Sequence, residues 1–358
     1  MTRPLTFKAG ERLMVFAPHP DDETIATGEL IQLARESGAD VRVVFATDGD
    51  NNPWPQRWCE RRLHIGPADR ERWGQRRRGE ARAALARLGV PPEAVRFLGW
   101  PDLGLTEKLE HDDAAIETLR EEIAAWRPTH VAMPSLRDRH PDHGALRVML
   151  ELALSRARSN CARLSYVVHG RDADADVIRL ARDPGRHARK REALMAHASQ
   201  ISLSKSRLMR WADEPESFEP AEPGGSIAGG ARGGIVLSLP LAPAFRYWRR
   251  HDVLLVIAHG ERIERARVPL PRLVGTAART ALGGALCAGR IDVDLDRGTL
   301  NIAISADAEG HVHGYVKLER TMPRVLIFDA DTWQRFGDFS ASQAPAVERV
   351  PVAHRASL

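Results

Sequence analysis

The sequence predicts an α/β protein, in which a doubly wound and mostly parallel sheet is followed by a smaller all-β, sandwich-like domain. Three observations lead to this prediction. Short β-branched runs alternate with helical patterns over the first ~200 residues, a segment rich in proline and glycine follows, and short strand patterns with tight turns come after it. Alternation of strands and helices is typical of parallel sheets with helices on both faces. We therefore expect an α/β domain over residues 1–213, a linker over residues 214–234 and a β-rich accessory domain over residues 235–358.

The elements of the α/β domain follow from the spacing of apolar residues and from the residues that end each run. The strands are short apolar runs with β-branched residues, and stop signals at Gly38, at Gly89 and before Pro128 end three of the helices. The predicted strands are residues 12–17, 40–47, 94–99, 129–135 and 164–170. The predicted helices are residues 22–38, 76–90, 114–128 and 141–157. In a doubly wound sheet of order 3-2-1-4-5, the first and fourth strands are neighbours.

The C-terminal part has short strand patterns and little helix. The predicted strand regions are residues 234–241, 252–260, 290–306 and 323–330, and Arg297-Gly298 is the predicted tip of a hairpin. This pattern favours a small sandwich. We expect it to have a structural or glycan-contacting role, because no cluster of catalytic residue types lies within it.

Composition and charge narrow the class of protein. Hydrophobic residues make up 43% and charged residues 28% of the chain, as in soluble globular proteins. No apolar run approaches the ~18 residues of a membrane span, and we expect no secretory signal. Three widely spaced cysteines indicate a reducing cytoplasm. The net charge of +4 is modest. We interpret the basic run at residues 70–87 as a solvated helix face rather than a phosphate-contacting patch, so no nucleic-acid partner is expected.

Two similar segments contain the candidate chemistry. The first, "PHPDDE", contains His19, Asp21, Asp22 and Glu23, and the second, "RHPDHG", contains His140, Asp142 and His143. Each follows a predicted strand and opens a predicted helix, and residues three apart share a face of the first helical turn. Because the first and fourth strands are neighbours, both segments end at the crevice where the strand order reverses and where such sheets bind ligands. The sequence therefore predicts a group of His and Asp side chains in one crevice.

Such a group has a recognised chemistry. Two histidines and a carboxylate with an open fourth position make a catalytic zinc site. Zinc lowers the pKa of a bound water to about 7, a remaining carboxylate takes its proton, and a remaining histidine donates to a leaving amine or stabilises an oxyanion. Taken alone, "DDE" is equally well explained as a helix cap and "HPDH" as a turn. The two segments together, at neighbouring strand ends, favour a metal site.

These two motifs, in this order, closely resemble those of the zinc-dependent N-deacetylase family named after LmbE and PIG-L. Members of that family remove an acetyl group from N-acetylglucosamine-type substrates. The resemblance covers roughly residues 10–220, with supporting matches at residues 47–50 ("TDGD"), 97–102 ("FLGWPD"), 190–200 ("KREALMAHASQ") and at Arg77 with Glu80. It implies a Rossmann-like fold, which agrees with the predicted strands, and one zinc ion per chain.

Carried over position by position, the resemblance also implies roles for single residues. It implies that three ligands hold the zinc ion, namely His19, Asp22 and His143. It further implies a general base at Asp21, a general acid or electrostatic partner at His140, and an orienting role toward His140 for Asp142. We interpret Glu23 as a helix cap or as a support of the ligands from behind. His197 is interpreted as a helix-face residue rather than a ligand.

Substrate contacts are predicted from a long connection and from strand ends. Residues 50–73 form a longer connection than usual, which predicts a lid or wall over the site. The candidate substrate contacts are Asp48, Trp54, Arg57, Arg77 and His169. Exposed tryptophan stacks on sugars and arginine pairs with phosphate or carboxylate, which predicts a phosphate-bearing glycan such as a nucleotide sugar or a lipid-linked sugar. A lipid-linked substrate would add peripheral membrane contact. The alternative is a loop whose tryptophans pack beneath it.

Three functions remain open from the sequence. The leading one is a zinc amidohydrolase acting on an N-acetylated amino sugar. The second is a metal-dependent phosphoesterase, because Asp and His clusters also bind two metals. The third is a non-catalytic glycan-binding protein that uses the β domain and the tryptophan-rich loop. The spare base argues against the third, since a binding module does not need one.

Overall fold

The protein was examined as a computed structural model, which describes residues 5–170, 177–219, 235–240, 251–270, 278–281, 287–294, 299–306, 311–321, 328–329 and 331–340. The chain divides into two compact units. The first comprises Met1–Glu222 with Leu326–Thr332, and the second comprises Pro223–Val325 with Trp333–Leu358. Residues 214–219 of the predicted linker lie in the first unit, and the rest of that segment lies outside the described residues.

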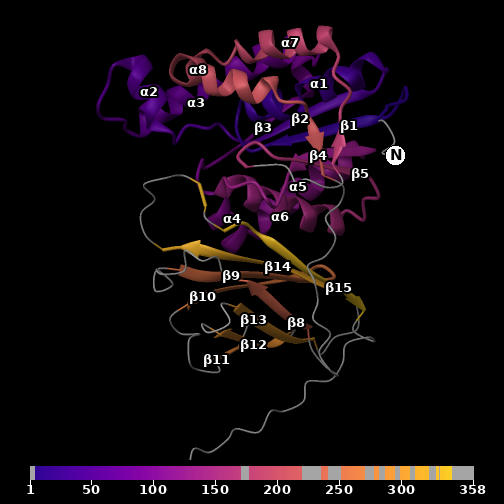
Figure 1. Cartoon of the computed structure of the whole chain (residues 1–358), viewed down its shortest axis with the longest axis vertical. Helices are drawn as coiled ribbons and strands as arrows, with labels where there is room; N and C mark the ends of the chain where they lie inside the picture. The colour runs from indigo at the N-terminus through magenta and orange to yellow at the C-terminus, as the bar shows by residue number, and fades with distance from the viewer. Residues whose placement is uncertain are drawn as a thin grey trace, which may run out of the picture. The chain divides into compact units, whose positions relative to one another are not determined.

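A five-stranded parallel sheet forms the centre of the first unit (Figure 1). Its strands are β1 (Arg12–Ala17), β2 (Asp40–Thr47), β3 (Val95–Trp100), β4 (His130–Pro134) and β5 (Ala162–Tyr166). The order β3-β2-β1-β4-β5 confirms the predicted order. Val15 in the middle of β1 pairs with Val43 of β2 on one side and Ala132 of β4 on the other. The carboxyl ends of β1 and β4 therefore meet, as the predicted crevice requires.

Helices cover both faces of this sheet. They are α1 (Asp22–Glu36), α2 (Pro53–Glu60), α3 (Pro67–Arg87), α4 (Leu105–His111), α5 (Asp113–Trp126), α6 (Pro141–Arg156), α7 (Pro184–Leu194) and α8 (Ala198–Asp213), with a 3-10 turn at Pro92–Ala94. In Figure 1, α1, α7 and α8 lie on one side of the sheet, and α4, α5 and α6 lie on the other. Because both faces are covered, β1 is a nearly continuous buried run rather than an alternating one. A short two-stranded sheet, β6 (Ile178–Arg179) with β7 (Ser217–Phe218), completes the unit.

The predicted long connection at residues 50–73 is largely helical, which corrects the sequence-based expectation of a loop. It contains all of α2 and the first turns of α3. Asn52 caps α2 by accepting a hydrogen bond from the backbone N–H of Trp54 at 3.3 Å, and Pro53 occupies the first helical position. Proline is favoured there because its missing N–H has no intrahelical partner to lose. Pro53 and Pro67 therefore begin the helices α2 and α3.

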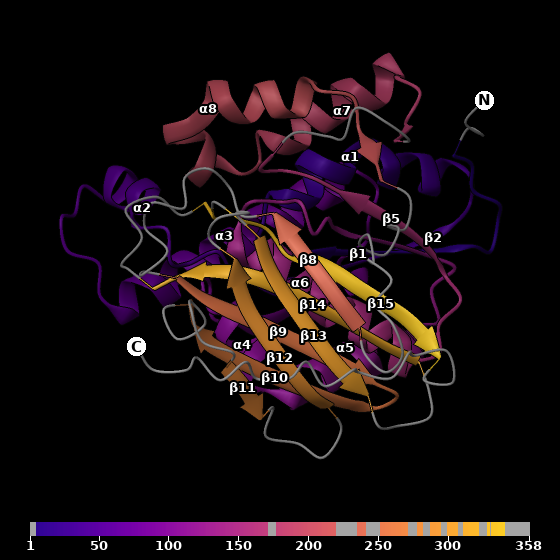
Figure 2. The same cartoon turned by 60° about the horizontal axis from the view of Figure 1, so that its bottom comes forward.

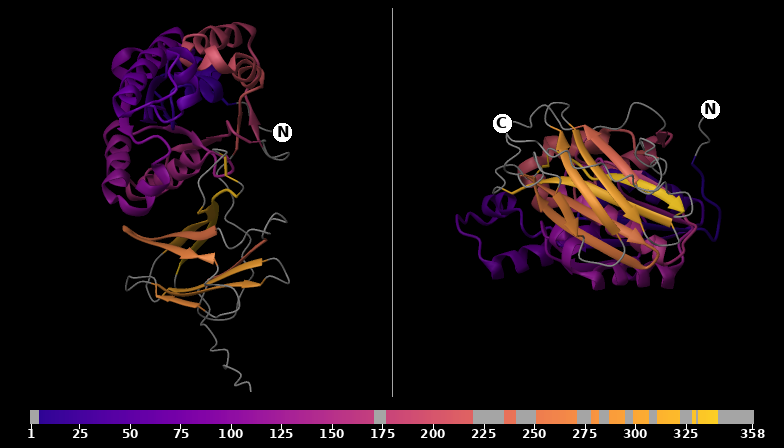
Figure 3. Two further views of the ribbon diagram at one scale, coloured as in Figure 1. Left: turned by 90° about the vertical axis from the view of Figure 1, so that its left-hand side faces the viewer. Right: turned by 90° about the horizontal axis from the view of Figure 1, so that it is seen from below.

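The second unit contains antiparallel strands. They are β8 (Ile235–Pro240), β9 (His251–His259), β10 (Arg262–Pro269), β11 (Ala278–Ala281), β12 (Cys287–Asp294), β13 (Thr299–Ala306), β14 (His311–Arg320) and β15 (Gln334–Ser340). They form two four-stranded sheets, β10-β9-β14-β15 and β11-β12-β13-β8, which Figures 2 and 3 show as two layers. The predicted hairpin tip at Arg297-Gly298 lies outside the described residues, but the strands on either side of it pair. Of the predicted strand at 323–330, Phe328 and Asp329 are described, and they are not in a strand.

Among the described residues, no helix is both long enough and apolar enough to cross a membrane. The cytoplasmic setting stays a prediction from the spacing of the cysteines.

Candidate active site

The first half of the site is the turn between β1 and α1. After β1 ends at Ala17, the chain turns through His19 and enters α1 at Asp22. The backbone N–H of His19 donates to Oδ2 of Asp22 at 3.0 Å, which folds the turn back on itself. Asp21, inside the turn, has a φ of 118°. This conformation costs a residue other than glycine about 1–3 kcal/mol, and such residues cluster at functional sites.

Glu23 and Arg77 hold Asp21 in this conformation. Its backbone N–H donates to Oε2 of Glu23 at 2.9 Å. The buried guanidinium of Arg77 donates to the carbonyls of Pro20 and Gly49, and its Nη2 lies 3.3 Å from Oδ2 of Asp21. Burial raises the pKa of Asp21 to about 6, against the opposing effect of Arg77. A carboxylate with a pKa near neutral is suited to act as a general base.

The second half of the site is the loop between β4 and α6. His140 caps α6, and its Nδ1 accepts a hydrogen bond from the backbone N–H of Asp142 at 3.3 Å. The backbone N–H of His140 donates to Oδ1 of Asp138 at 2.9 Å. Burial, together with the neighbouring imidazoles, holds the pKa of His140 well below its usual value. A neutral His140 whose Nδ1 is an acceptor has its proton on Nε2, where it can be donated.

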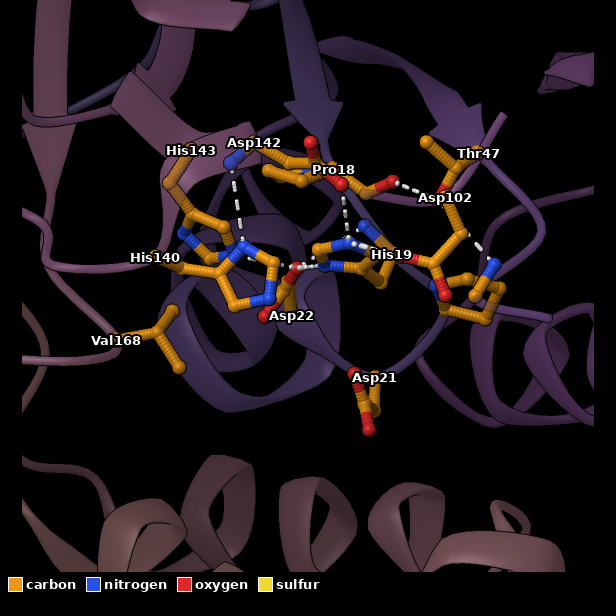
Figure 4. A network of polar contacts seen from close by, with 12 residues as sticks. Pro18, His19, Asp21, Asp22, Thr47, Asp102, His140, Asp142, His143 and Val168 are labelled. Carbon is orange, nitrogen blue, oxygen red and sulfur yellow. Dashed lines mark hydrogen bonds and ion pairs between the residues drawn. The ribbon is translucent and has the colours of Figure 1, made fainter. Parts of the chain in front are cut away.

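The two halves meet at the Asp22 carboxylate. Its Oδ2 lies 3.1 Å from Nδ1 of His19 and 3.1 Å from Nε2 of His143. Figure 4 shows these side chains and His140 gathered together, while the Asp21 carboxylate stands apart from them. Ring nitrogens of His19, His140 and His143 lie within 4.8 Å of one another. The structure thus brings the three predicted zinc ligands to one place.

The surroundings of His143 fit a metal ion at this place. Its ring is fully buried, and neither nitrogen makes a hydrogen bond, although Asp22 lies 3.1 Å from Nε2 and Asp138 lies 3.0 Å from Nδ1. Buried polar atoms without a hydrogen-bond partner are rare and call for an explanation such as an ion. Burial lowers the pKa of His143, but Asp138 and Asp22 raise it to about 9, so a metal would displace a proton there. Histidine nitrogens with a carboxylate oxygen are donors that zinc accepts.

The position of Asp142 differs from the expectation that its side chain orients His140. Its Oδ2 instead lies 3.3 Å from Nε2 of His19. The same carboxylate accepts backbone N–H bonds from Leu103 at 2.7 Å and from Leu105 at 3.1 Å. Only the backbone of Asp142 reaches His140. The N–H groups at the start of α4 attract the carboxylate, and α4 was not predicted from the sequence.

Two further aspartates complete the site, and sequence reasoning missed both. Oδ1 of Asp102 lies 3.2 Å from Nε2 of His19. Asp138 is buried behind His143, and its Oδ2 accepts backbone N–H bonds from Val168 at 2.8 Å and His169 at 3.0 Å. Carboxylates that hold the second nitrogen of a histidine ligand fix its orientation. The sequence gives only weak signals for these two aspartates. Asp102 is the last residue of "FLGWPD", and Asp138 lies two residues before "HPDH".

Glu23 and His197 form a buried pair beneath the first turn of α1. Nε2 of His197 lies 3.2 Å from Oε1 of Glu23, and both side chains are fully buried. Thr24 donates its hydroxyl to the same oxygen at 2.7 Å. His197 precedes α8 and joins that helix to α1, so it does not lie on an exposed helix face.

Known proteins share this sequence pattern. The pattern of the family described as PIG-L: GlcNAc-PI de-N-acetylase matches residues 14–154. A 1D-myo-inositol 2-acetamido-2-deoxy-alpha-D-glucopyranoside deacetylase of Mycolicibacterium gilvum (strain PYR-GCK) is 32% identical over 239 residues, which cover 54% of this chain and 82% of that relative. The chain belongs to the PIG-L family.

Other proteins related to this PIG-L chain match over different shares of their length. A deacetylase of the same description from Mycobacterium sp. (strain KMS) is 31% identical over 196 residues, or 50% of this chain and 62% of the relative. The chain therefore spans less than two thirds of that relative. The solved structure of the N,N'-diacetylchitobiose deacetylase from Pyrococcus horikoshii has 18% sequence identity and a TM-score of 0.46, covering 59% of this chain and 84% of that one.

The residues predicted to contact substrate have different surroundings in this PIG-L chain. His169 lies at the site, with its ring 4.8 Å from that of His143. Arg77 is buried and shapes the turn at Asp21.

The other three candidates have partners of their own. Both oxygens of Asp48 accept hydrogen bonds from Arg78, at 2.7 and 2.6 Å. On α2, Trp54 is 64% exposed, and the guanidinium of Arg57 lies over its ring at 5.1 Å. Trp54 therefore remains largely open to solvent although Arg57 lies over its ring.

Proposed function

We propose that this chain is a zinc-dependent amidohydrolase that removes the N-acetyl group from an N-acetylglucosamine-type amino sugar and releases acetate. The observation that carries the proposal is the arrangement at Asp22. Its carboxylate lies between His19 and His143, while the neighbouring Asp21 carboxylate stands apart from that group. A ligand set with a spare carboxylate beside it supports hydrolysis rather than binding alone.

His19, Asp22 and His143 would hold the zinc ion, which when bound would polarise the amide carbonyl and acidify water. Asp21 would accept the proton of the attacking water, since Arg77 holds its carboxylate and the hydrogen bond from its backbone N–H to Glu23 fixes the turn beside Asp22. His140 would donate a hydrogen bond from Nε2, first to the developing oxyanion and then to the nitrogen of the leaving amine, and that amine would leave with the proton that Asp21 took from the water.

The chain's other carboxylates prepare these groups. Asp102 and Asp142 would keep Nδ1 of His19 directed toward Asp22, because both contact its Nε2. Asp138 would do the same for His143 through its Nδ1. The names of the relatives support a substrate in which the amino sugar is joined to another polar group, such as an inositol.

The proposal is tested by measuring acetate and free amine released from a panel of N-acetyl sugars. The panel comprises free N-acetylglucosamine, its inositol glycoside, a nucleotide-linked form and a lipid-linked form, with a phosphate monoester as the control. We expect equal amounts of acetate and amine from at least one sugar, and no phosphate. Release of phosphate without acetate would support the phosphoesterase alternative, and no product from any substrate would favour a binding protein.

A further inference from the structure

A segment that is distant in the sequence lies beside the site. Residues 326–332 connect β14 to β15 of the second unit but belong to the first unit. The backbone N–H of Asp329 donates to the carbonyl of Arg139 at 2.8 Å. Nε of Arg139 donates in return to the carbonyl of Asp329 at 3.0 Å. Since Arg139 directly precedes His140, these two hydrogen bonds attach the segment to the loop that forms half of the site.

The attachment places Phe328 against two histidines of the site. Its ring centroid lies 5.1 Å from that of His169 and 6.3 Å from that of His140. Phe328 nevertheless keeps 42% of its surface exposed. A single exposed apolar side chain is ordinary on a protein surface, but Phe328 is exposed directly beside two histidines of the site, where a bound substrate would meet its ring.

We propose that Phe328 forms an aromatic wall of the substrate site and stacks on the apolar face of the sugar ring. This inference rests on the proposed function. In that reaction His140 faces the leaving amine, and the sugar ring is the group bonded to that amine. The group that extends from His140 toward solvent is therefore the sugar rather than the acetyl group. Phe328 has no polar atom, so it would contact the C–H face of the ring and leave the hydroxyls to polar partners.

The inference gives the connection between β14 and β15 a defined role. The segment lies between two strands of the second unit in the chain, and it adds a side chain to a site whose histidine and aspartate cluster comes from residues 19–169. A shortened connection would remove this wall without altering any predicted zinc ligand. The segment is thus a specificity-determining part of the chain and has no part in the chemical step.

The test compares three variants on two substrates. Phe328→Ala removes the ring, Phe328→Trp preserves an aromatic face, and Leu203→Ala removes a comparably exposed apolar side chain (44%) from α8 as a control. The substrates are the N-acetyl and N-propionyl forms of whichever sugar the wild-type protein hydrolyses best. Inhibition by the deacylated amino sugar reports binding without chemistry. Thermal unfolding and zinc content check that each variant is folded and loaded.

For Phe328→Ala we expect KM to rise about tenfold for both substrates, with kcat nearly unchanged. Inhibition by the amino sugar should also weaken about tenfold, because the loss of one aromatic contact lowers binding affinity by about that factor. Phe328→Trp and Leu203→Ala should stay within about twofold of wild type. An unchanged KM in active Phe328→Ala would overturn the inference. The inference would also be overturned if the ratio of kcat/KM for the N-propionyl substrate to kcat/KM for the N-acetyl substrate changed while inhibition by the amino sugar did not weaken. That result would place Phe328 against the acyl group. Failure of the proposed function is distinguishable, since the wild-type protein would then release no acetate.

Discussion

Replacing Asp138 by asparagine tests how the site holds its histidines. The two oxygens of Asp138 accept three backbone N–H bonds, from His140 at 2.9 Å, Val168 at 2.8 Å and His169 at 3.0 Å. The carboxylate also lies 3.0 Å from Nδ1 of His143. Burial alone would raise the pKa of Asp138, but the imidazoles of His143 and His169 hold it well below the usual value. The aspartate is therefore charged, and its charge balances the histidines.

Asparagine has nearly the same shape but only one acceptor oxygen. Whichever way the amide is turned, its NH2 group faces at least one backbone N–H that Asp138 accepts. Losing one buried hydrogen bond to a charged acceptor costs about 1.5–3 kcal/mol. For a unit of this size that lowers the melting temperature by about 3–12 °C. Because His143 also loses its anionic partner, we expect zinc affinity to fall about 10- to 100-fold.

The assay is a zinc competition titration against a fluorescent chelator, with thermal unfolding measured on the same samples. Asp40→Asn is the matched control, because Asp40 is exposed at the start of β2. It should bind zinc and unfold as the wild type does. If Asp138→Asn kept wild-type zinc affinity, the carboxylate would not be positioning His143, and our account of the site behind the ligands would be refuted.

Three further outcomes are expected. Asp21→Asn should lower kcat in the acetate-release assay by a factor of about 10²–10⁴, because the residue accepts a proton. Its zinc content by metal analysis should stay the same, because Asp21 is not a ligand, and loss of zinc together with activity would contradict this. Lys190→Met should lower the free energy of unfolding by about 3–5 kcal/mol in thermal unfolding, because Lys190 is fully buried 2.8 Å from Glu216 and its loss leaves that buried carboxylate with backbone N–H donors but without its cation. A Lys190→Met variant as stable as the wild type would mean that the pair does not stabilise the fold. Chelation of the metal should lower the melting temperature of the first unit, because the buried carboxylates of Asp22, Asp138 and Asp142 lose a nearby cation. Added zinc should restore the melting temperature, and an unchanged value after chelation would argue against a bound ion.

The central sheet was predictable because its signals are local. The apolar runs that form β1 and β2 are bounded by Pro18 and Gly38, and their order follows from the alternation with helices. The helix α2 was not predictable from the same signals. Pro53 and Pro55 reduce helical propensity inside a helix but favour its first turn, and only the cap at Asn52 distinguishes the two cases.

The candidate ligands were predictable because they lie in two short motifs at neighbouring strand ends. The residues behind them were not, because their roles depend on contacts between distant segments. Asp102 lies two residues after the end of β3, and it reaches His19 in the turn after β1 only because the sheet brings these strand ends together. Phe328 follows the same pattern, since no spacing in the sequence connects it with His169. The orientation of Asp142 depended on the backbone of α4, which the sequence pattern did not reveal.

Zinc titration of acetate release is the most direct test of the proposed reaction. The metal-free protein is given increasing zinc and assayed on its best N-acetyl sugar. We predict no release without metal, a rise that saturates at one zinc per chain, and no such rise for His143→Ala. Full activity in the metal-free protein, or saturation only at two metals per chain with release of phosphate, would contradict the account.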